Sequence, residues 1–516
     1  MHDLTRVCAA ALSGALLLSW TACAPIPLDP LDTGTGDPGT SGTTTAEPAP
    51  TTTAEPDTTT IATDGDTTDG DTVSPTDDAT SDAPPVTCTE VVVADPQLLL
   101  DIRAALAVPE GPITPEAAQT LTELTASQGV ATLDGLECFP NLVVLSIAGD
   151  GNTVTDLGPL AHLKQLGTLT LTDSPITDLG PLASLPALTD LDISGTAVED
   201  LTPLASVPTL SRLSAFRTSI SSFVPLTGHP GLTKIEAAQL KGPVDPSGLG
   251  QIPGLRFLDL SFNKLDDLEF LRGAPSLTYL ALAGVGIADI SPLKDLTNLE
   301  ILILLHNNIT GLAPLAGLTG LVSLTVDNNL VASVAPLAGL TALEELRLAN
   351  NAIVDVTPLT GLTKLSTLDV HGNKVANLAA LAGLPGLKQL DVGKNPLPGL
   401  AALIGAPMLD ELTALDAGLT AITVVSPDTL TILDIQGNKI SDISPLLDYQ
   451  HLGFVGLQDN QISTLEPLLD ANWPDKCAVL INVEGNPLDA ETLDTIIPAL
   501  CASGLPLFWD SGHCEC

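Results

Sequence analysis

The sequence predicts an α/β solenoid, a curved stack of small units in which each unit adds one strand to a parallel sheet on the concave side and a short 3-10 turn on the convex side. Two observations support this prediction. One leucine pattern recurs about every 22 residues, and hydrophobic residues make up 44% of the 516 residues although aromatic residues make up only 3%. A core built almost wholly from aliphatic side chains is typical of many copies of one unit.

The repeat reads L-x-x-L-x-L-x-x-N-x-I/V-x-x-L-x-P-L-x-x-L-x-x. In the copy that begins at Leu343, Leu346 and Leu348 stand two residues apart, so both side chains point inward from a short strand. No unit can bury its leucines alone, so the units must stack on one another. Clear copies begin at Leu166, Leu188, Leu210, Leu232, Leu255, Leu277, Leu299, Leu321, Leu343, Leu365, Leu387, Leu409, Leu430 and Leu452, and looser copies begin at Leu121, Leu142 and Ala478, which gives about seventeen units.

The turn after each strand is expected to carry a ladder of side-chain hydrogen bonds. An asparagine amide at this position bonds to the backbone of the neighbouring turn, and Ser174, Thr196 and Thr218 take its place in early repeats. Pro-Leu pairs such as Pro292-Leu293 restart the chain on the far side, where room remains only for a 3-10 turn. The ladder residues are Asn263, Asn307, Asn329, Asn351, Asn373, Asn395, Asn438, Asn460 and Asn486.

This pattern resembles the leucine-rich repeats of the internalin family of bacterial surface proteins, from about residue 90 to about residue 500. The resemblance implies a leucine-rich-repeat horseshoe that is capped at both ends. Residues 93–106 and 113–116 look like the helical cap of such proteins, with Thr114 before Pro115 as a helix start. Residues 491–500 look like a closing helix. We find no counterpart of the immunoglobulin-like module and wall anchor of internalins, so the resemblance covers the binding scaffold and not the attachment.

The N-terminus indicates export. Arg6 precedes an uncharged apolar stretch over residues 7–20, which is typical of a signal peptide (1–22) and short for a membrane span. Thr21-Ala22-Cys23 resembles the end of a bacterial lipoprotein signal, which implies a lipidated Cys23, although Trp20 stands where that family prefers leucine. The expected location is then the bacterial cell envelope, on the outer membrane, facing the periplasm or the cell surface. The alternative is ordinary cleavage and a secreted protein.

Residues 23–86 are predicted to form a disordered tether. From residue 24 to 86 the sequence has 13 acidic residues, no lysine or arginine and no aromatic residue, so it lacks the apolar surface that would offset the entropy of ordering. The other expected parts are an N-terminal cap with a first partial repeat (87–141), the repeats (142–488) and a C-terminal cap (489–516). The formal net charge of −44 argues against nucleic acid or anionic lipid as a partner, because both need the opposite sign.

Six cysteines lie only in the two predicted caps, a distribution typical of disulfides in an exported protein. Cys88 and Cys138 are expected to pair, and Cys477, Cys501, Cys514 and Cys516 are expected to form two bridges whose connectivity the sequence leaves open. A zinc site at residues 513–516 is the rival interpretation. Zinc needs four ligands with deprotonated thiols, so we expect disulfides and no metal.

The sequence contains no recognisable catalytic motif. The seven histidines are scattered, and there is no nucleophile elbow, phosphate-binding loop or zinc-protease motif. A glycosidase needs a carboxylic acid of raised pKa in a cleft, whereas the aspartates that share one concave column are expected to be solvated. We therefore expect a protein that is not an enzyme and that needs no cofactor. The column contains Asp192, Asp259, Asp369, Asp391 and Asp434.

One part of the expected concave face differs from the rest. Phe257, Tyr279 and Ile301 share one position in successive repeats, where other repeats carry mostly small polar or charged residues. An aromatic cluster with cations around it, on an acidic chain, is typical of a binding hot spot. The alternative is that these side chains only pack along the sheet. The predicted site comprises Phe216, Phe257, Phe262, Tyr279, Ile301, Ile303, Leu305, Arg212 and Arg256, with Arg217, Lys234 and His306 at its margin. The irregular repeat from Lys241 to Gly254 is expected to add a loop to the rim of this site.

These features favour a surface-exposed, non-catalytic monomer that binds a protein ligand through its concave face and reaches the membrane only through its lipid. Two alternatives stay open. A uniform face of small polar residues would favour a structural spacer of the envelope without a specific ligand. Aromatic platforms with bridging carboxylates would favour a glycan-binding or peptidoglycan-binding module.

Overall fold

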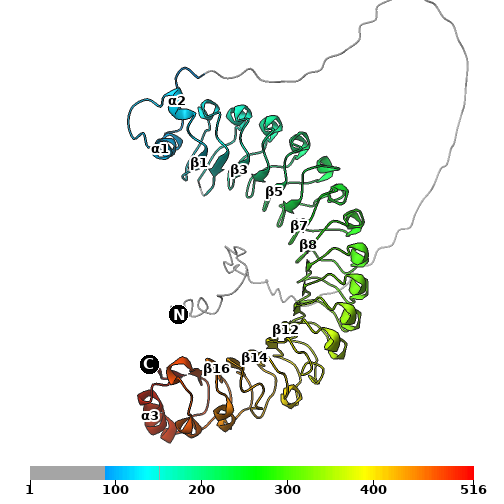
Figure 1. The fold of residues 1–516 in the computed structure, drawn as a ribbon, viewed down its shortest axis with the longest axis vertical. Helices are drawn as coiled ribbons and strands as arrows, with labels where there is room; N and C mark the ends of the chain where they lie inside the picture. The colour runs from blue at the N-terminus through cyan, green and yellow to red at the C-terminus, as the bar shows by residue number, and fades with distance from the viewer. Residues whose placement is uncertain (1–87, 150, 516) are drawn as a thin grey trace, which may run out of the picture. The chain divides into compact units, whose positions relative to one another are not determined.

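The computed structural model describes residues 88–149 and 151–515, and within them 19 strands form a single sheet. Strands β1 to β17 each pair in parallel with the next strand along the chain, and β18 pairs antiparallel with β19. Figure 1 shows the strands of this part along the inner side of a curve and the turns along its outer side. The predicted solenoid is thus confirmed, whereas the predicted signal peptide, Cys23 and tether lie outside the described residues.

The helices of the two caps are α1 (Pro96–Ala105), α2 (Pro115–Ala118) and α3 (Ile497–Ala502), and a π-helical turn, η17 (Thr492–Ile496), precedes α3. The strands are β1 (Glu123–Ala126), β2 (Val144–Ile147), β3 (Thr168–Leu171), β4 (Asp190–Asp192), β5 (Arg212–Ser214), β6 (Lys234–Glu236), β7 (Phe257–Asp259), β8 (Tyr279–Ala281), β9 (Ile301–Ile303), β10 (Ser323–Thr325), β11 (Glu345–Arg347), β12 (Thr367–Asp369), β13 (Gln389–Asp391), β14 (Glu411–Thr413), β15 (Ile432–Asp434), β16 (Phe454–Gly456), β17 (Leu480–Asn482), β18 (Leu507–Trp509) and β19 (Gly512–Cys514).

The 3-10 turns of the outer side are η2 (Leu136–Cys138), η3 (Gly158–His162), η4 (Gly180–Ser184), η5 (Thr202–Ser206), η6 (Val224–Leu226), η7 (Leu249–Gln251), η8 (Glu269–Gly273), η9 (Ser291–Asp295), η10 (Ala313–Gly317), η11 (Ala335–Gly339), η12 (Thr357–Gly361), η13 (Ala401–Leu403), η14 (Ser444–Asp448), η15 (Glu466–Asp470) and η16 (Lys476–Ala478).

The register of the sheet follows the repeat. Leu324 of β10 pairs with Leu346 of β11, which pairs with Leu368 of β12, and each of these side chains is at most 1% exposed. Because side chains alternate along a strand, the residues on either side of each leucine face the concave surface. Each unit therefore offers two concave positions per strand, and these positions form rows that run along the whole sheet.

The predicted asparagine ladder is confirmed. The Oδ1 atom of Asn373 accepts the backbone N–H of Ile353 at 2.9 Å, and its Nδ2 atom donates to the carbonyls of Leu348 and Val370 at 2.8 and 2.9 Å. The other predicted asparagines make equivalent bonds. Asn152, which the sequence analysis missed, makes similar bonds near the N-terminal cap. Each amide joins the backbones of two units in a buried place, where an unpaired polar group would be costly.

The N-terminal cap covers the first strand. The side chain of Asp95 accepts from the first turn of α1, and Thr114 accepts the N–H of Ala117 at 3.2 Å ahead of Pro115, as predicted. Helix α1 packs on β1 through fully buried apolar residues. A disulfide joins Cys88 to Cys138, with Cα atoms 5.6 Å apart, which confirms the predicted pair.

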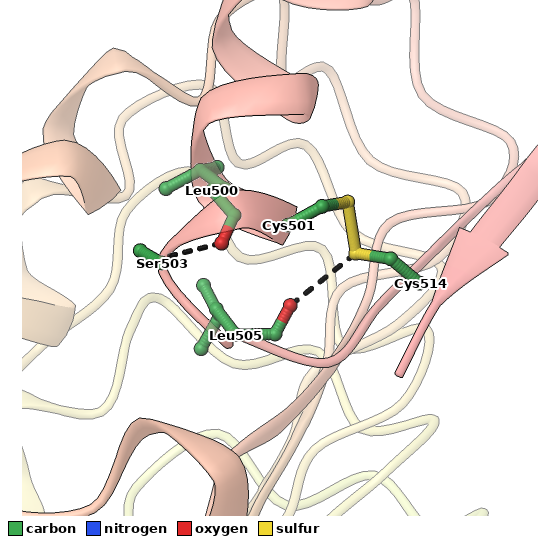
Figure 2. Close-up of a disulfide and its surroundings, with 5 residues drawn as sticks. All are labelled: Leu500, Cys501, Ser503, Leu505 and Cys514. Atoms are coloured by element: carbon green, nitrogen blue, oxygen red, sulfur yellow. Dashed lines mark hydrogen bonds between the residues drawn. A yellow bond between two sulfur atoms is a disulfide. The ribbon is translucent and has the colours of Figure 1, made fainter. Parts of the chain in front are cut away.

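The C-terminal cap closes the other end of the core. Figure 2 shows the disulfide that joins Cys501, in α3, to Cys514, in β19. Beside it, Ser503 Oγ donates to the Leu500 carbonyl at 2.7 Å, and the Cys514 sulfur lies 3.4 Å from the Leu505 carbonyl oxygen. Cys477 is disulfide-bonded as well, and Cys516 lies outside the described residues.

Two local expectations differ from the structure. The closing helix predicted for residues 491–500 is interrupted by η17, because Pro498 has no N–H to continue the α-helical bonding. The irregular repeat adds no loop to the concave rim: Asp245 bridges to Ser222, just before η6, and the segment around it lines a hollow of about 510 Å³ together with Phe270 of η8. Across residues 88–149 and 151–515, no helix has the length and apolar character that a membrane span requires.

Candidate binding surface on the concave face

The first row of the concave face, the residue before the inward leucine of each strand, carries the predicted aromatic stack. Lys234, Phe257, Tyr279 and Ile301 stand side by side in β6 to β9. The rings of Phe257 and Tyr279 stack with centroids 3.9 Å apart and planes 6° apart. The Nζ atom of Lys234 lies 4.5 Å from the centroid of the Phe257 ring and forms a cation–π contact with it. Neighbouring side chains thus cover much of the ring faces.

The second row, the residue after the inward leucine, is polar beside this stack. Glu236 of β6 is paired, since its carboxylate meets Lys234 Nζ at 3.1 Å and Ser214 Oγ at 3.0 Å. Asp259 of β7 accepts the backbone N–H of Ser261 at 2.8 Å and, among the described residues, forms no salt bridge. Burial, with a smaller contribution from the charge of Glu236, raises the pKa of Asp259.

The carboxylates of Asp259 and Glu236 also affect the pKa of Tyr279. Burial first, and then the charges of Asp259 and Glu236, raise the pKa of the Tyr279 phenol to about 12. The phenol therefore stays protonated at neutral pH and remains a hydrogen-bond donor. In β8 and β9 the second row changes to the apolar residues Ala281 and Ile303.

A second aromatic group lies in the turns beyond the strands. Phe262 is 52% exposed and has a backbone φ of 59°, in the left-handed region that is costly for a bulky residue. Its ring lies over Gly284, where an added Cβ would come within 2.7 Å of a ring carbon. At the equivalent turn two strands earlier, the Arg217 guanidinium lies 4.8 Å from the centroid of the Phe216 ring. The equivalent residues of other repeats, such as Gln239 and His306, have the same left-handed φ, so this backbone conformation belongs to the repeat. What distinguishes Phe262 is a large aromatic ring that is exposed at this position.

The remaining predicted residues border these groups. Ile301, Ile303 and Leu305 are half-buried in β9 and in the turn after it. Arg212 is exposed and pairs with Asp190 on the neighbouring strand, and Arg256 is exposed just before β7. Both arginines are therefore marginal to the apolar surface. We name as the aromatic patch the residues Phe216, Phe257, Phe262, Tyr279, Ile301, Ile303 and Leu305.

A second group of polar residues occupies the concave face of β10 to β14. Burial raises the pKa of Asp327 to about 6, although the N–H of Ala349 donates to its carboxylate at 2.6 Å. His371 Nδ1 lies 3.5 Å from Asp391 Oδ1. Beside them is a hollow of about 170 Å³ whose lining residues include Arg347 and Asp391. Asp327 was not among the predicted site residues, because it stands two residues beyond the second row, outside the column of aspartates that the sequence brings out.

The aspartates of the second row are not simply solvated, as the sequence analysis expected. Each is half-buried, and each accepts the backbone N–H two residues further along the chain. They cap the turn after the strand, and although these hydrogen bonds lower the carboxyl pKa, burial outweighs them and raises the pKa of Asp259, Asp391 and Asp434. Within the described ranges, no group of three or more histidine, cysteine, aspartate or glutamate side chains is placed to hold a metal ion.

The fold and surface define a class of protein. A family model described as leucine-rich repeats (2 copies) matches residues 297–339 and 341–383. Together with the parallel sheet and its 3-10 turns, this match shows a leucine-rich-repeat solenoid, a scaffold that is generally non-catalytic and typical of protein–protein interaction modules. No curated protein sequence matches the chain.

Solved structures share the fold. An internalin (inlF) from Listeria monocytogenes is 29% identical with a TM-score of 0.57, and the match covers 62% of this chain and 94% of that one. A leucine-rich-repeat protein of Leptospira interrogans is 21% identical with a TM-score of 0.64, covering 71% of this chain and 96% of that one. The leucine-rich-repeat ectodomain of the receptor kinase GASSHO1/SCHENGEN3 from Arabidopsis thaliana, in complex with Casparian strip integrity factor 2, is 18% identical with a TM-score of 0.51, covering 73% and 54%. The latter two show the fold alone.

Proposed function

We propose that this chain is a surface-exposed, non-catalytic protein that holds a protein ligand against the aromatic patch. The observation that carries the proposal is Phe262, whose ring is 52% exposed in the turn after β7, the strand whose Phe257 stacks on Tyr279. Packing along the sheet does not require an exposed aromatic residue in a turn, whereas binding hot spots are enriched in large aromatic side chains. The ligand-bound receptor ectodomain with the same fold gives general support, since it too is a leucine-rich-repeat protein in a complex.

The two alternative functions fit the surface less well. A spacer needs no contiguous apolar surface, yet the patch combines aromatic and aliphatic residues from β5 to β9 and the turns that follow. A glycan platform needs an open ring face, but Lys234 and Tyr279 cover the two faces of Phe257. We therefore favour a protein ligand over a sugar.

We also propose that the protein acts as a monomer in the bacterial cell envelope, where Cys23 would carry the lipid and residues 23–86 would serve as the tether. The support is the N-terminal sequence, in which an apolar stretch leads to Thr21-Ala22-Cys23 and then to an acidic segment without aromatic residues. Such an anchor would leave the concave face free to meet a ligand. Release of a secreted form is the alternative.

The test is a binding measurement with a partner captured by the full chain, identified and then purified. Phe257→Ala and Tyr279→Ala should each lower its affinity roughly thirtyfold, as expected for the loss of a buried aromatic anchor worth ~2 kcal/mol. Thr367→Ala is the matched control, because Thr367 occupies the same first row in β12, away from the patch. Equal affinity of all three variants, with unchanged melting temperatures, would place the binding site elsewhere.

A further inference from the structure

Asp259 is a carboxylate beside the aromatic patch whose charge is not matched. Its Oδ1 accepts the N–H of Ser261, and among the described residues no cationic group lies within salt-bridge distance of it. The charge of Lys234 lowers the pKa of Asp259 less than burial raises it, and Lys234 is itself paired with Glu236. Asp259 is thus half-buried and lacks an ionic partner.

Asp259 stands between β8 and the turn that carries Phe262. Its neighbour there is Ala281, which is 2% exposed and offers only a methyl group. On the first row beside them stands Tyr279, paired in register with Phe257. On the other side, beyond Ser261, stands Phe262. Because Ala281 is buried, a ligand side chain can reach this place only at the exposed part of Asp259, near Tyr279 and Phe262.

A protein that covers the patch must also cover Asp259. Burying a carboxylate without a partner costs several kcal/mol of binding free energy, so a wholly apolar ligand would bind weakly here. A cationic side chain removes this cost through a charge-assisted hydrogen bond. Lysine and arginine also carry an apolar stem that can lie along aromatic surface while the charged head reaches a carboxylate. Lys234 on the ring of Phe257 is an example of such a contact within the chain itself.

We infer that the protein ligand places one lysine or arginine side chain against the aromatic patch, with its apolar stem along the aromatic side chains and its cationic head on Asp259. This inference rests on the proposed function, because it concerns the same patch. Glu236, next to Asp259 in the second row, is paired with Lys234, so Asp259 is the carboxylate at this place that remains for the cationic head. The ligand is thus expected to present a cationic residue flanked by apolar residues.

The experiment selects linear peptides from a random display library on the full chain and keeps those that lose binding to Tyr279→Ala. The retained peptides should share a lysine or arginine at one position, and Asp259→Asn should weaken them roughly tenfold, as expected for a close charge pair. Asparagine keeps an oxygen for the N–H of Ser261, so the turn is preserved. Asp434→Asn is the matched control, since Asp434 is a half-buried aspartate of the same row in β15, and it should change nothing.

A double-mutant cycle then isolates the pair. Replacing the shared cationic residue of the peptide with norleucine should weaken binding to the parent chain roughly tenfold, and should cause little further loss on Asp259→Asn. Peptides that depend on Tyr279 but lack a shared cationic residue, or that bind Asp259→Asn as well as the parent, would overturn the inference and leave the aromatic patch in place. A selection that yields no peptide dependent on Tyr279 would overturn the patch and the inference together.

Discussion

At the scale of single residues, burial governs the carboxylates of the concave face more than ion pairing does. Burial is the largest contribution to the raised pKa of Asp259 and Asp327. On the outer side, by contrast, hydrogen bonds from Thr202 lower the pKa of Asp200. At neutral pH an ionised aspartate therefore destabilises the fold where it is buried on the concave side, and stabilises the fold where it is hydrogen-bonded on the outer side.

Asp327→Asn should stabilise the fold more at pH 7 than at roughly pH 4.5. The pKa of Asp327 is about 6 in the folded chain against an ordinary value of 3.8. Between these values the folded state binds more protons than the unfolded state, so the stability of the parent falls as pH rises through this window. The asparagine oxygen can still accept the N–H of Ala349. Urea unfolding of both proteins at the two pH values measures the difference.

The control for this prediction is Asp355→Asn. Hydrogen bonds from Thr357 lower the pKa of Asp355, which lies on the outer side. The parent should therefore gain stability relative to this variant as pH rises through the ordinary range of an aspartate, which is the opposite trend. A stability difference between parent and Asp327→Asn that stays constant with pH would contradict the assigned pKa.

At the scale of elements, the repeat spacing was sufficient to predict the strands, the 3-10 turns and the asparagine ladder. Every inward position must be apolar, and the ladder side chains must find hydrogen-bond partners. The pattern can therefore be recognised in a single sequence. The π-turn before α3 was missed because one proline, Pro498, redirects the bonding of a helix that the pattern still predicts. The position of the irregular repeat was predicted wrongly, because the length of a repeat alone does not indicate whether an extra residue lies on the concave or the outer side.

The candidate site was predictable only in part, for the same reason. The row that contains Phe257 and Tyr279 follows from the register, so the sequence could place both rings together. The sequence could not show that the ring of Phe262 is exposed over Gly284, or that Asp259 lacks an ionic partner. Those features depend on the turn geometry and on which cation reaches which carboxylate.

Replacing Cys88 and Cys138 with alanine should destabilise the N-terminal cap. The loss should be larger than the loss in the C-terminal cap when Cys501 and Cys514 are replaced. The first disulfide spans 50 residues and the second spans 13. The chain-entropy model gives about 4 and about 3 kcal/mol for loops of these lengths. Because each unit contacts mainly its neighbours, the loss should be local.

Hydrogen exchange of the full chain measures this locality. Exchange should accelerate in α1 and β1 when the first disulfide is removed, and in α3 and β18 when the second is removed. Strand β10, in the middle of the sheet, is the internal control and should keep its protection in both variants. A uniform acceleration along the sheet, or a larger effect at the C-terminal cap, would contradict the prediction.

At the scale of the whole molecule, the net charge acts on a ligand over a longer distance than the apolar surface does. The chain has 62 acidic residues against 18 lysines and arginines, so its field attracts cations over distances of about a Debye length, ~10 Å at 0.1 M salt. The aromatic patch acts only in contact. A cationic ligand would therefore be drawn by the whole chain and held by a few residues of β7 to β9.

The association rate of a patch-binding cationic peptide should consequently fall as salt rises, while its dissociation rate changes little. Raising the salt from about 20 mM to about 200 mM shortens the Debye length roughly threefold and should slow association roughly tenfold. Phe257→Ala should do the reverse, speeding dissociation with the salt dependence of association unchanged, because it removes contact and no charge. Surface plasmon resonance at the two salt concentrations separates the two rates. An association rate that does not respond to salt would mean that the acidic surface has no part in ligand capture.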